Sequence, residues 1–150
     1  MGRLFVLVGS KMKSEKVTFD DGSQAVAVVN DARTEAEILN LSEKIAAEDA
    51  ELVLWRIDCF EQVTQMNHLL ELAPMIKEKL SGIPLLVVFR SQKQGGATEL
   101  DSEDAYLNLV KIAIDFGLGD AIDIEMDHTQ DRIQSLIQDA HHRGLKVVIN

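Results

Sequence analysis

The sequence predicts an α/β fold in which an N-terminal hairpin is followed by about four βα units and a fifth strand. Short apolar runs rich in β-branched residues alternate with longer segments whose apolar residues recur at helical spacing. Capping residues and glycines separate the two kinds of segment. Such alternation predicts a parallel sheet covered by helices. We expect one domain over residues 1–150, with the hairpin in 1–24 and the βα units in 25–150.

The expected strands are the short apolar runs. Those of the hairpin are residues 3–8 and 16–19, with a turn near residues 9–10 or 20–22. Those of the parallel sheet are residues 25–29, 52–57, 85–89, 122–125 and 146–149. None of these runs approaches the roughly 20 apolar residues that a membrane-spanning helix needs.

The expected helices begin and end at recognisable signals. Thr34 is a candidate N-cap, and Glu37 completes a capping box for a helix that extends to about residue 47. The other helices are expected at residues 63–80, 101–116 and 131–142. Pro74 predicts a kink or break inside the first of these, and Asp101 is the expected start of the second.

Composition and charge argue against several classes of function. Twenty-five acids and fifteen bases give a formal charge of −10, so the surface repels nucleic-acid phosphates. No G-x-G-x-x-G or P-loop pattern is present, and the histidines lack metal-ligand spacing. We therefore expect no nucleic-acid partner, no membrane span, no metal and no cofactor. The single cysteine, Cys59, predicts a protein without internal disulfides, as is usual in the reducing cytoplasm.

Charged and polar side chains follow three of the expected parallel strands. Arg56 and Asp58 come after the second strand, Arg90 and Ser91 after the third, and Glu125 after the fourth. Because functional residues collect at the carboxyl ends of parallel strands, these groups are expected along one edge of the sheet. A guanidinium binds a carboxylate through two parallel hydrogen bonds. The sequence therefore predicts a site for a small, oxygen-rich anion.

The same residues also have structural interpretations that need no ligand. Arg56 would pair with Asp58 or Glu51 at the end of its strand, and Arg90 would cap the loop that follows it. Glu125 would pair with one of the two arginines. Both kinds of role are compatible with the sequence.

Three residues next to the predicted site residues in the sequence have simpler interpretations. Trp55 is expected in core packing rather than as a platform for a ligand. Gly95 and Gly96 are expected to supply positive φ angles for a tight loop, with a close approach of the backbone to a ligand as the alternative.

Two architectures are compatible with this order of elements: an open doubly wound sheet and part of a closed eight-stranded barrel. A complete barrel typically has about 250 residues, more than this chain contains. A nucleotide-binding doubly wound sheet would carry a Gly-rich turn after its first parallel strand, and VVNDART at residues 28–34 has none.

Four segments together resemble a known family. LVLWRIDCF, IPLLVVFRSQKQGG, GLGDAIDIE and AHHRGLKVVI, in this order and spacing, are similar to the N-terminal half of type I 3-dehydroquinate dehydratase. The similarity covers residues 25–150. It implies half of the family's (β/α)8 barrel, preceded by a short hairpin. It also implies the family's reaction, the dehydration of 3-dehydroquinate to 3-dehydroshikimate in the shikimate pathway through a Schiff base.

The resemblance implies substrate-binding roles for Arg56, Arg90, Ser91, Gln94 and Glu125. Arg56 matches the arginine of the family's E-W-R segment, and Arg90 matches the arginine that grips the substrate carboxylate. Two positions depart from the pattern. Leu54 stands where the family has glutamate, and Gln94 stands where the family's K-x-G-G loop carries an acid.

No catalytic residue is expected in this chain. The family's general acid/base histidine follows the fifth strand and its imine-forming lysine lies on the sixth, so both would come after Asn150. Lys93 lies on a polar loop that would not lower its pKa, and Lys146 lies at the opposite end of the sheet. We expect a dehydratase-like protein that is inactive on its own. The alternative is a non-catalytic structural or regulatory module that binds a small carboxylate or a partner chain.

A half-barrel is expected to expose two sheet edges and much of an apolar interior. The chain is therefore expected to form a homo-oligomer through these edges or to pair with a separate complementary half. The expected small-molecule partner is a carboxylate such as 3-dehydroquinate, and the expected location is the cytoplasm.

Overall fold

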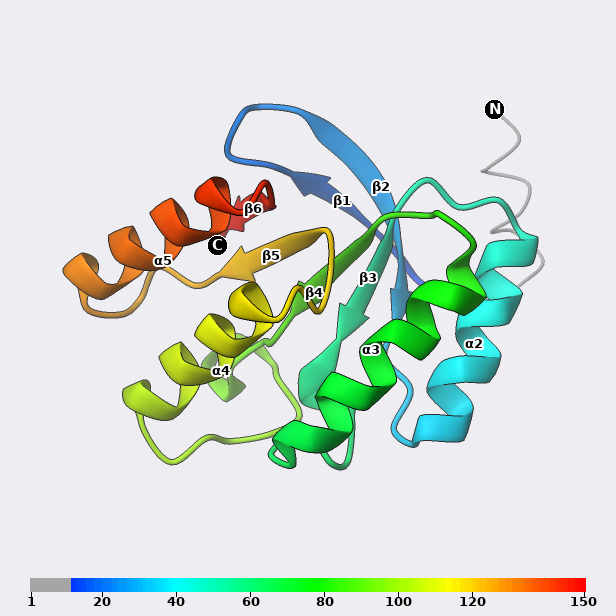
Figure 1. The fold of residues 1–150 in the computed structure, drawn as a ribbon, viewed down its shortest axis with the longest axis horizontal. Helices are drawn as coiled ribbons and strands as arrows, with labels where there is room; N and C mark the ends of the chain where they lie inside the picture. The colour runs from blue at the N-terminus through cyan, green and yellow to red at the C-terminus, as the bar shows by residue number, and fades with distance from the viewer. Residues whose placement is uncertain (1–11) are drawn as a thin grey trace.

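Six strands form one sheet in a computed structural model that describes residues 12–150, and they follow one another across the sheet in sequence order (Figure 1). They are β1 (Ser14–Thr18), β2 (Gln24–Asn30), β3 (Val53–Arg56), β4 (Leu85–Val88), β5 (Ala121–Ile124) and β6 (Lys146–Ile149). The helices of this part of the chain are α2 (Glu35–Ala47), α3 (Met66–Leu80), α4 (Glu103–Asp115) and α5 (Gln130–His142). Short 3-10 helices, η1 (Ile57–Cys59) and η2 (Gln92–Gln94), follow β3 and β4. The predicted alternation of strand and helix is confirmed from β2 onward.

The hairpin extends beyond residue 24, where its end was expected. β1 pairs antiparallel with β2, whereas every later pair of neighbouring strands is parallel. β2 is therefore both the second strand of the hairpin and the first strand of the parallel sheet. The predicted turn at residues 20–22 is confirmed, because the Gly22 N–H donates to the Phe19 carbonyl at 2.9 Å. The strand expected at residues 3–8 lies outside the described residues.

The helices begin after residues that cap their free N–H groups. The Thr34 hydroxyl accepts the Glu37 N–H and the Glu37 carboxylate accepts the Thr34 N–H, each at 3.2 Å, which confirms the capping box. The cap of α4 is Ser102, whose hydroxyl accepts the Ala105 N–H at 3.1 Å. The predicted start at Asp101 is therefore wrong: the cap lies one residue later, because it is the Ser102 side chain that reaches the first turn, and the helix itself begins at Glu103.

Helix α3 differs from the prediction in two respects. It begins at Met66 rather than at residue 63, because the Val63 N–H bonds to the Phe60 carbonyl at 3.1 Å in a preceding turn. Pro74 lies inside α3, and the helix continues on both sides of it. A proline removes one intrahelical hydrogen bond, and the burial of Leu69, Leu72 and Ile76 against the sheet is sufficient to keep the helix continuous.

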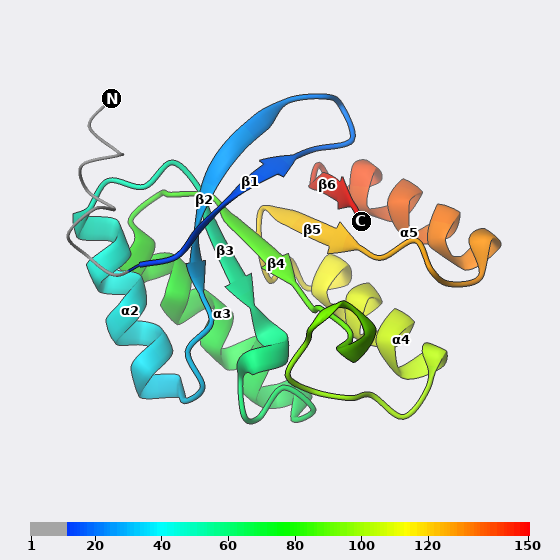
Figure 2. The same ribbon diagram turned by 180° about the vertical axis from the view of Figure 1, so that it is seen from behind.

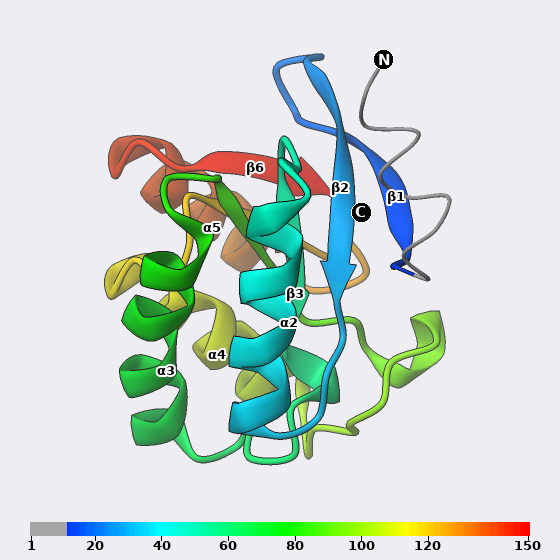
Figure 3. The same ribbon diagram turned by 90° about the vertical axis from the view of Figure 1, so that its right-hand side faces the viewer.

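The four helices lie on one face of the sheet, as the side view shows (Figure 3). Alternate strand residues point to this face and pack with the helices in the larger apolar core, among them Val53, Trp55, Leu85 and Val87. Trp55 is fully buried there, so its predicted role in core packing is confirmed.

The opposite face of the sheet is concave, and the hairpin crosses over it (Figure 2). A second apolar cluster lies there, in which Val17 and Phe19 of the hairpin pack with residues such as Leu54 and Leu86. Burial of each such side chain stabilises the fold by about 1.5–3 kcal/mol. The expectation that much of this interior would be exposed is corrected, because the hairpin covers part of it.

The turn of the hairpin reaches the last strand of the sheet. The Asp20 N–H donates to the Val147 carbonyl at 2.8 Å, and the Lys146 ammonium lies 4.8 Å from the centre of the Phe19 ring. β1 and β6 therefore lie on either side of a single space, although they stand at opposite ends of the strand order.

Candidate functional site

The predicted site residues follow parallel strands that run in the same direction. Arg56 ends β3, Arg90 follows β4 and Glu125 follows β5. Arg56 stands opposite Val88 in the register of the sheet, so the ends of β3 and β4 lie side by side. The predicted gathering of these residues at the carboxyl edge of the sheet follows from this arrangement.

Arg56 forms a largely buried ion pair with Asp58. Its Nη2 lies 2.6 Å from Oδ2 of Asp58 and its Nε lies 3.3 Å from Oδ1. Burial opposes the charge on Arg56, but the hydrogen bond and the charge of Asp58 outweigh it and raise the pKa of the guanidinium. Glu51, the other partner considered for Arg56, instead accepts the Val26 N–H at 2.6 Å. The structural interpretation of Arg56 as a partner of Asp58 is thus confirmed.

Asp58 also fixes the loop after β4. Its fully buried carboxylate accepts the Arg90 N–H at 3.2 Å and the Ala97 N–H at 3.0 Å. Its carbonyl accepts the Thr98 hydroxyl at 2.6 Å. One acid after β3 therefore holds both ends of the loop that carries the predicted site residues.

The two glycines of this loop have different functions. Gly95 has a φ of 87°, so it supplies the positive φ that was predicted. The positive φ predicted for Gly96 is wrong, because Gly96 is not among the residues with positive φ. A Cβ atom at Gly96 would instead overlap the carbonyl oxygen of Arg90. The Gly96 N–H donates to the Ser91 carbonyl at 2.8 Å. The absence of a side chain at Gly96 thus allows the loop to close tightly on the backbone of Arg90 itself.

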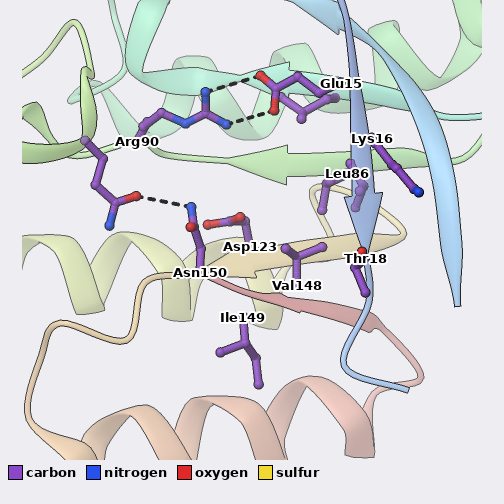
Figure 4. Close-up of a pocket in the computed structure, with 12 residues that line it drawn as sticks. Glu15, Lys16, Thr18, Leu86, Arg90, Asp123, Val148, Ile149 and Asn150 are labelled. Atoms are coloured by element: carbon purple, nitrogen blue, oxygen red, sulfur yellow. Dashed lines mark hydrogen bonds and ion pairs between the residues drawn. The ribbon is translucent and has the colours of Figure 1, made fainter. Parts of the chain in front are cut away.

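The Arg90 guanidinium is held by a carboxylate from the hairpin. Its Nη1 and Nη2 each lie 3.3 Å from one carboxylate oxygen of Glu15 on β1, which gives a two-pronged ion pair (Figure 4). The side chains remain 21% and 38% exposed, so solvent still reaches the pair. The alternative in which the Arg90 side chain caps its own loop is therefore wrong, because the guanidinium extends to a strand 75 residues away.

Arg90 and Glu15 line a cavity of about 470 Å³ on the concave face. Asp123 lines the same cavity (Figure 4). Leu54 and Gln94 line it as well. The other lining residues are Lys16, Val17, Thr18, Leu86, Val148, Ile149 and Asn150. Of the predicted site residues, Arg90 and Gln94 are thus brought together. Arg56, Ser91 and Glu125 do not line this cavity.

Asp123 is a cavity residue that was not among the predicted site residues. It is 5% exposed, and its Oδ1 has no hydrogen-bond partner among the described residues. Burial raises the pKa of its carboxyl to about 7. The charge of Arg90 opposes this rise, the charges of Glu125 and Glu15 add to it, and a hydrogen bond with the Asn150 side chain opposes it. A signal for it exists in the sequence, since an aspartate in the apolar run AIDI must point to one face of a buried strand.

Gln94 contacts the last residue of the chain. Its side-chain oxygen accepts a hydrogen bond from the Asn150 amide at 3.1 Å. Both groups are neutral amides, which can orient a ligand but have no proton to exchange at neutral pH. The adjacent Lys93 points to solvent and pairs with Asp127 at 2.7 Å, and this hydrogen bond raises the pKa of its ammonium.

Ser91 and Glu125 form a separate contact beside the cavity. The Ser91 N–H donates to the buried Glu125 carboxylate at 2.9 Å, and Nε2 of His128 lies 3.6 Å from the other oxygen. The predicted pairing of Glu125 with an arginine is wrong, because Arg56 and Arg90 are engaged by Asp58 and Glu15.

No helix between residues 12 and 150 is long and apolar enough to cross a bilayer. Within the same range, no three His, Cys, Asp or Glu side chains form a group that could hold a metal ion.

The fold and the cavity define a class of protein, the half of a (β/α)8 barrel with a charged site at the carboxyl edge of its sheet. Residues 26–150 match the family model of type I 3-dehydroquinase, and the chain belongs to this family. A 3-dehydroquinate dehydratase from Klebsiella pneumoniae is 37% identical over 136 residues, which are 91% of this chain and 54% of that protein. One from Syntrophotalea carbinolica is 32% identical over 139 residues, 93% of this chain and 54% of that protein.

Solved structures give the same relationship. The 3-dehydroquinate dehydratase from Enterococcus faecalis superposes with a TM-score of 0.77 at 30% identity, over 90% of this chain and 53% of that one. The type I enzyme from Clostridium difficile, solved with covalently modified comenic acid, gives a TM-score of 0.76 at 26% identity, over 91% of this chain and 56% of that one. The chain thus spans about half the length of the relatives that it matches.

Proposed function

We propose that this chain is a carboxylate-binding half-barrel of the type I 3-dehydroquinase family, and that it binds 3-dehydroquinate without dehydrating it on its own. The observation that carries the proposal is the Arg90 guanidinium, which lines a cavity of about 470 Å³ and already holds the Glu15 carboxylate there. A group that grips one carboxylate with both nitrogens is suited to grip that of a ligand.

The chemistry of the cavity supports binding without reaction. Imine formation needs an amine with a lowered pKa, close to the ligand. Lys93 does not line the cavity, and its pKa is raised by Asp127. Lys16, at the cavity wall, is exposed on β1. Gln94 and Leu54 contribute no group that could move a proton.

A second candidate is a structural module in which both arginines serve the fold. It is favoured by their partners, since Arg56 is neutralised by Asp58 and Arg90 by Glu15. In this case the Arg90–Glu15 pair fastens the hairpin to the loop after β4, and the cavity holds only water. A binding experiment separates the two candidates.

The experiment is a calorimetric titration of the whole chain with 3-dehydroquinate. The carboxylate-binding function requires saturable binding that weakens at least about tenfold in Arg90→Ala, because a charge-assisted pair is lost. Arg132→Ala removes an arginine that pairs with Asp104 on the surface, and serves as the matched control. Unchanged affinity in Arg90→Ala, or no binding by the native chain, would favour the structural module.

The lack of reaction is tested by reduction with borohydride in the presence of 3-dehydroquinate. Mass spectrometry should then show the unmodified mass of the chain, because Lys16 at the cavity wall is exposed to solvent and is not activated to form an imine. A covalent adduct on the chain alone would overturn this part of the proposal.

We further propose that the chain forms a homo-oligomer and works in the cytoplasm. β1 and β6 are the outer strands of the sheet, and Ile149 on β6 is a half-exposed apolar residue, which supports pairing with a second chain. The free thiol of Cys59 supports a reducing compartment. Light scattering that gives the mass of a monomer at micromolar concentration would count against self-association.

A further inference from the structure

Asp123 is the buried acid of the cavity, and four elements surround it. Its side chain leaves β5 on the concave face, beside that of Asn150 at the end of β6 (Figure 4). The charged groups that act on it are Arg90 after β4, Glu15 on β1 and Glu125 after β5. Only Arg90 is positive, and Glu15 already neutralises it.

An unpaired oxygen on a buried acid is costly, and the site favours the neutral form. A carboxylate that loses water without gaining a donor loses a large solvation free energy. Oδ1 of Asp123 is in this position. A protonated carboxyl avoids most of this cost, and it gains an O–H group that needs an acceptor. Oδ1 has no hydrogen-bond partner among the described residues, and the cavity is the space in which a ligand can supply one.

We propose that Asp123, in its protonated form, donates a hydrogen bond to a small carboxylate held on Arg90, so that the cavity takes up one proton with each carboxylate anion. This inference rests on the proposed function, because it needs Arg90 as the ligand's anchor. The proton comes from the solvent, and no covalent bond is made or broken.

The charge balance of the cavity supports the coupling. A ligand carboxylate that replaces Glu15 on Arg90 adds one negative charge to a space that Glu15 also lines, and the charge of Glu125 acts on Asp123 as well. A proton on Asp123 cancels that added charge. An ionised Asp123 would instead repel the ligand at short range, where the interior screens charge weakly.

The sign of the pH dependence follows from the pKa of Asp123. In the free protein burial raises this pKa to about 7, and a bound anion raises it further. The affinity for the ligand therefore has its highest value below about pH 7. It falls about tenfold for each pH unit above 7, until the pH exceeds the pKa of the bound state.

The test is a titration of the whole chain with quinate, a hydroxycarboxylate that lacks the ketone an imine requires. Calorimetry at pH 8 in two buffers of different ionisation enthalpy gives the number of protons taken up. Between about 0.5 and 1 proton per quinate is expected, since most free Asp123 is ionised at that pH. Binding without proton uptake in the native chain would overturn the inference, even if no variant folded.

The matched variants are Asp123→Asn and Asp127→Asn. Asparagine keeps a donor of similar shape and has no titrating proton, so Asp123→Asn should bind quinate with an affinity that does not change between pH 6 and 8.5, and without proton uptake. Asp127 lies on the loop after β5 and pairs with the exposed Lys93, so Asp127→Asn should retain the native pH dependence. Native proton uptake in a folded Asp123→Asn would assign the proton to another group and reject the role of Asp123.

The outcomes distinguish a failure of the role of Asp123 from a failure of the proposed carboxylate-binding function. No quinate binding by the native chain at any pH from 5.5 to 8.5 rejects the carboxylate site itself, and with it the role of Asp123. Binding that is lost in Arg90→Ala but takes up no proton retains the carboxylate site and rejects only the role of Asp123.

Discussion

The carboxylate of Asp58 accepts a hydrogen bond from the backbone N–H of Arg90 at 3.2 Å, although the two residues are 32 positions apart. The same carboxylate neutralises Arg56. The backbone position from which the Arg90 side chain enters the cavity is therefore held by an acid in η1, after the neighbouring strand β3, and not by the β4 loop alone.

Asp58→Ala should destabilise the protein on the order of 3 kcal/mol, because it leaves Arg56 with little solvent and no partner and removes the acceptor of two backbone N–H groups. Urea denaturation measures the change. Asp127→Ala removes an exposed acid from the next loop and should leave the midpoint nearly unchanged. Equal midpoints for the two variants would show that Asp58 does not organise the loop.

Gly96→Ala should be more harmful than Gly95→Ala. A methyl group at Gly95 meets no atom, and its cost of about 1 kcal/mol comes from the positive φ. A methyl group at Gly96 meets the Arg90 carbonyl, so the loop must move and take Arg90 with it. We expect a lower melting temperature for Gly96→Ala, together with weaker binding of 3-dehydroquinate. A Gly96→Ala variant that matched Gly95→Ala in both measurements would contradict the tight closure.

Glu15→Gln should strengthen the binding of 3-dehydroquinate by up to about fivefold. The partly exposed Arg90–Glu15 pair contributes about 0.2–1 kcal/mol, and the ligand no longer has to replace it. Calorimetry at pH 6.5 gives the dissociation constants. Glu43→Gln removes an acid that pairs with Lys79 on the helical face and is the control, with no expected change. Weaker binding in Glu15→Gln would show that Glu15 assists the ligand instead of competing with it.

Asp123→Asn should stabilise the protein at neutral pH. Because burial raises the folded-state pKa of Asp123 to about 7, above the unfolded value, the folded state binds more protons between about pH 4 and 7. The free energy of unfolding that this proton contributes is fully present below about pH 4, and it is lost as the pH rises through 7. The variant should therefore be more stable than the native chain on the order of 3 kcal/mol at pH 7.5, and the difference should vanish near pH 4. Urea midpoints across this range are the measurement, and a less stable variant at pH 7.5 would contradict it.

Local sequence signals predicted most of the fold. The Thr34 capping box was found because its two bonds join residues three positions apart. The Arg56–Asp58 pair was considered for the same reason, since its members are two positions apart. The order of strands and helices followed from periodicity, which depends on each segment's own residues.

The site was predicted less completely, because its contacts join distant segments. Nothing near Arg90 in the sequence indicates that its partner is Glu15, which lies on the hairpin. The carboxyl edge contains several polar residues, and their tertiary partners determine which of them enter the cavity. Arg90 and Gln94 do so, whereas Arg56 turns to Asp58. The position of Asp123 in the cavity could have been predicted, because alternate residues of its strand point to opposite faces of the sheet.

The contact between the hairpin turn and α5, the last helix, also bears on how the chain folds. The Asp20 carboxylate lies 2.8 Å from Nε2 of His141, and these residues are 121 positions apart. Closing so long a loop costs conformational entropy before any contact compensates for it, and folds with many such contacts form slowly. The βα units between them can form from nearer neighbours. The wall of the cavity made by β1 and β6 is then assembled last, so ligand binding should return later in refolding than helical structure does.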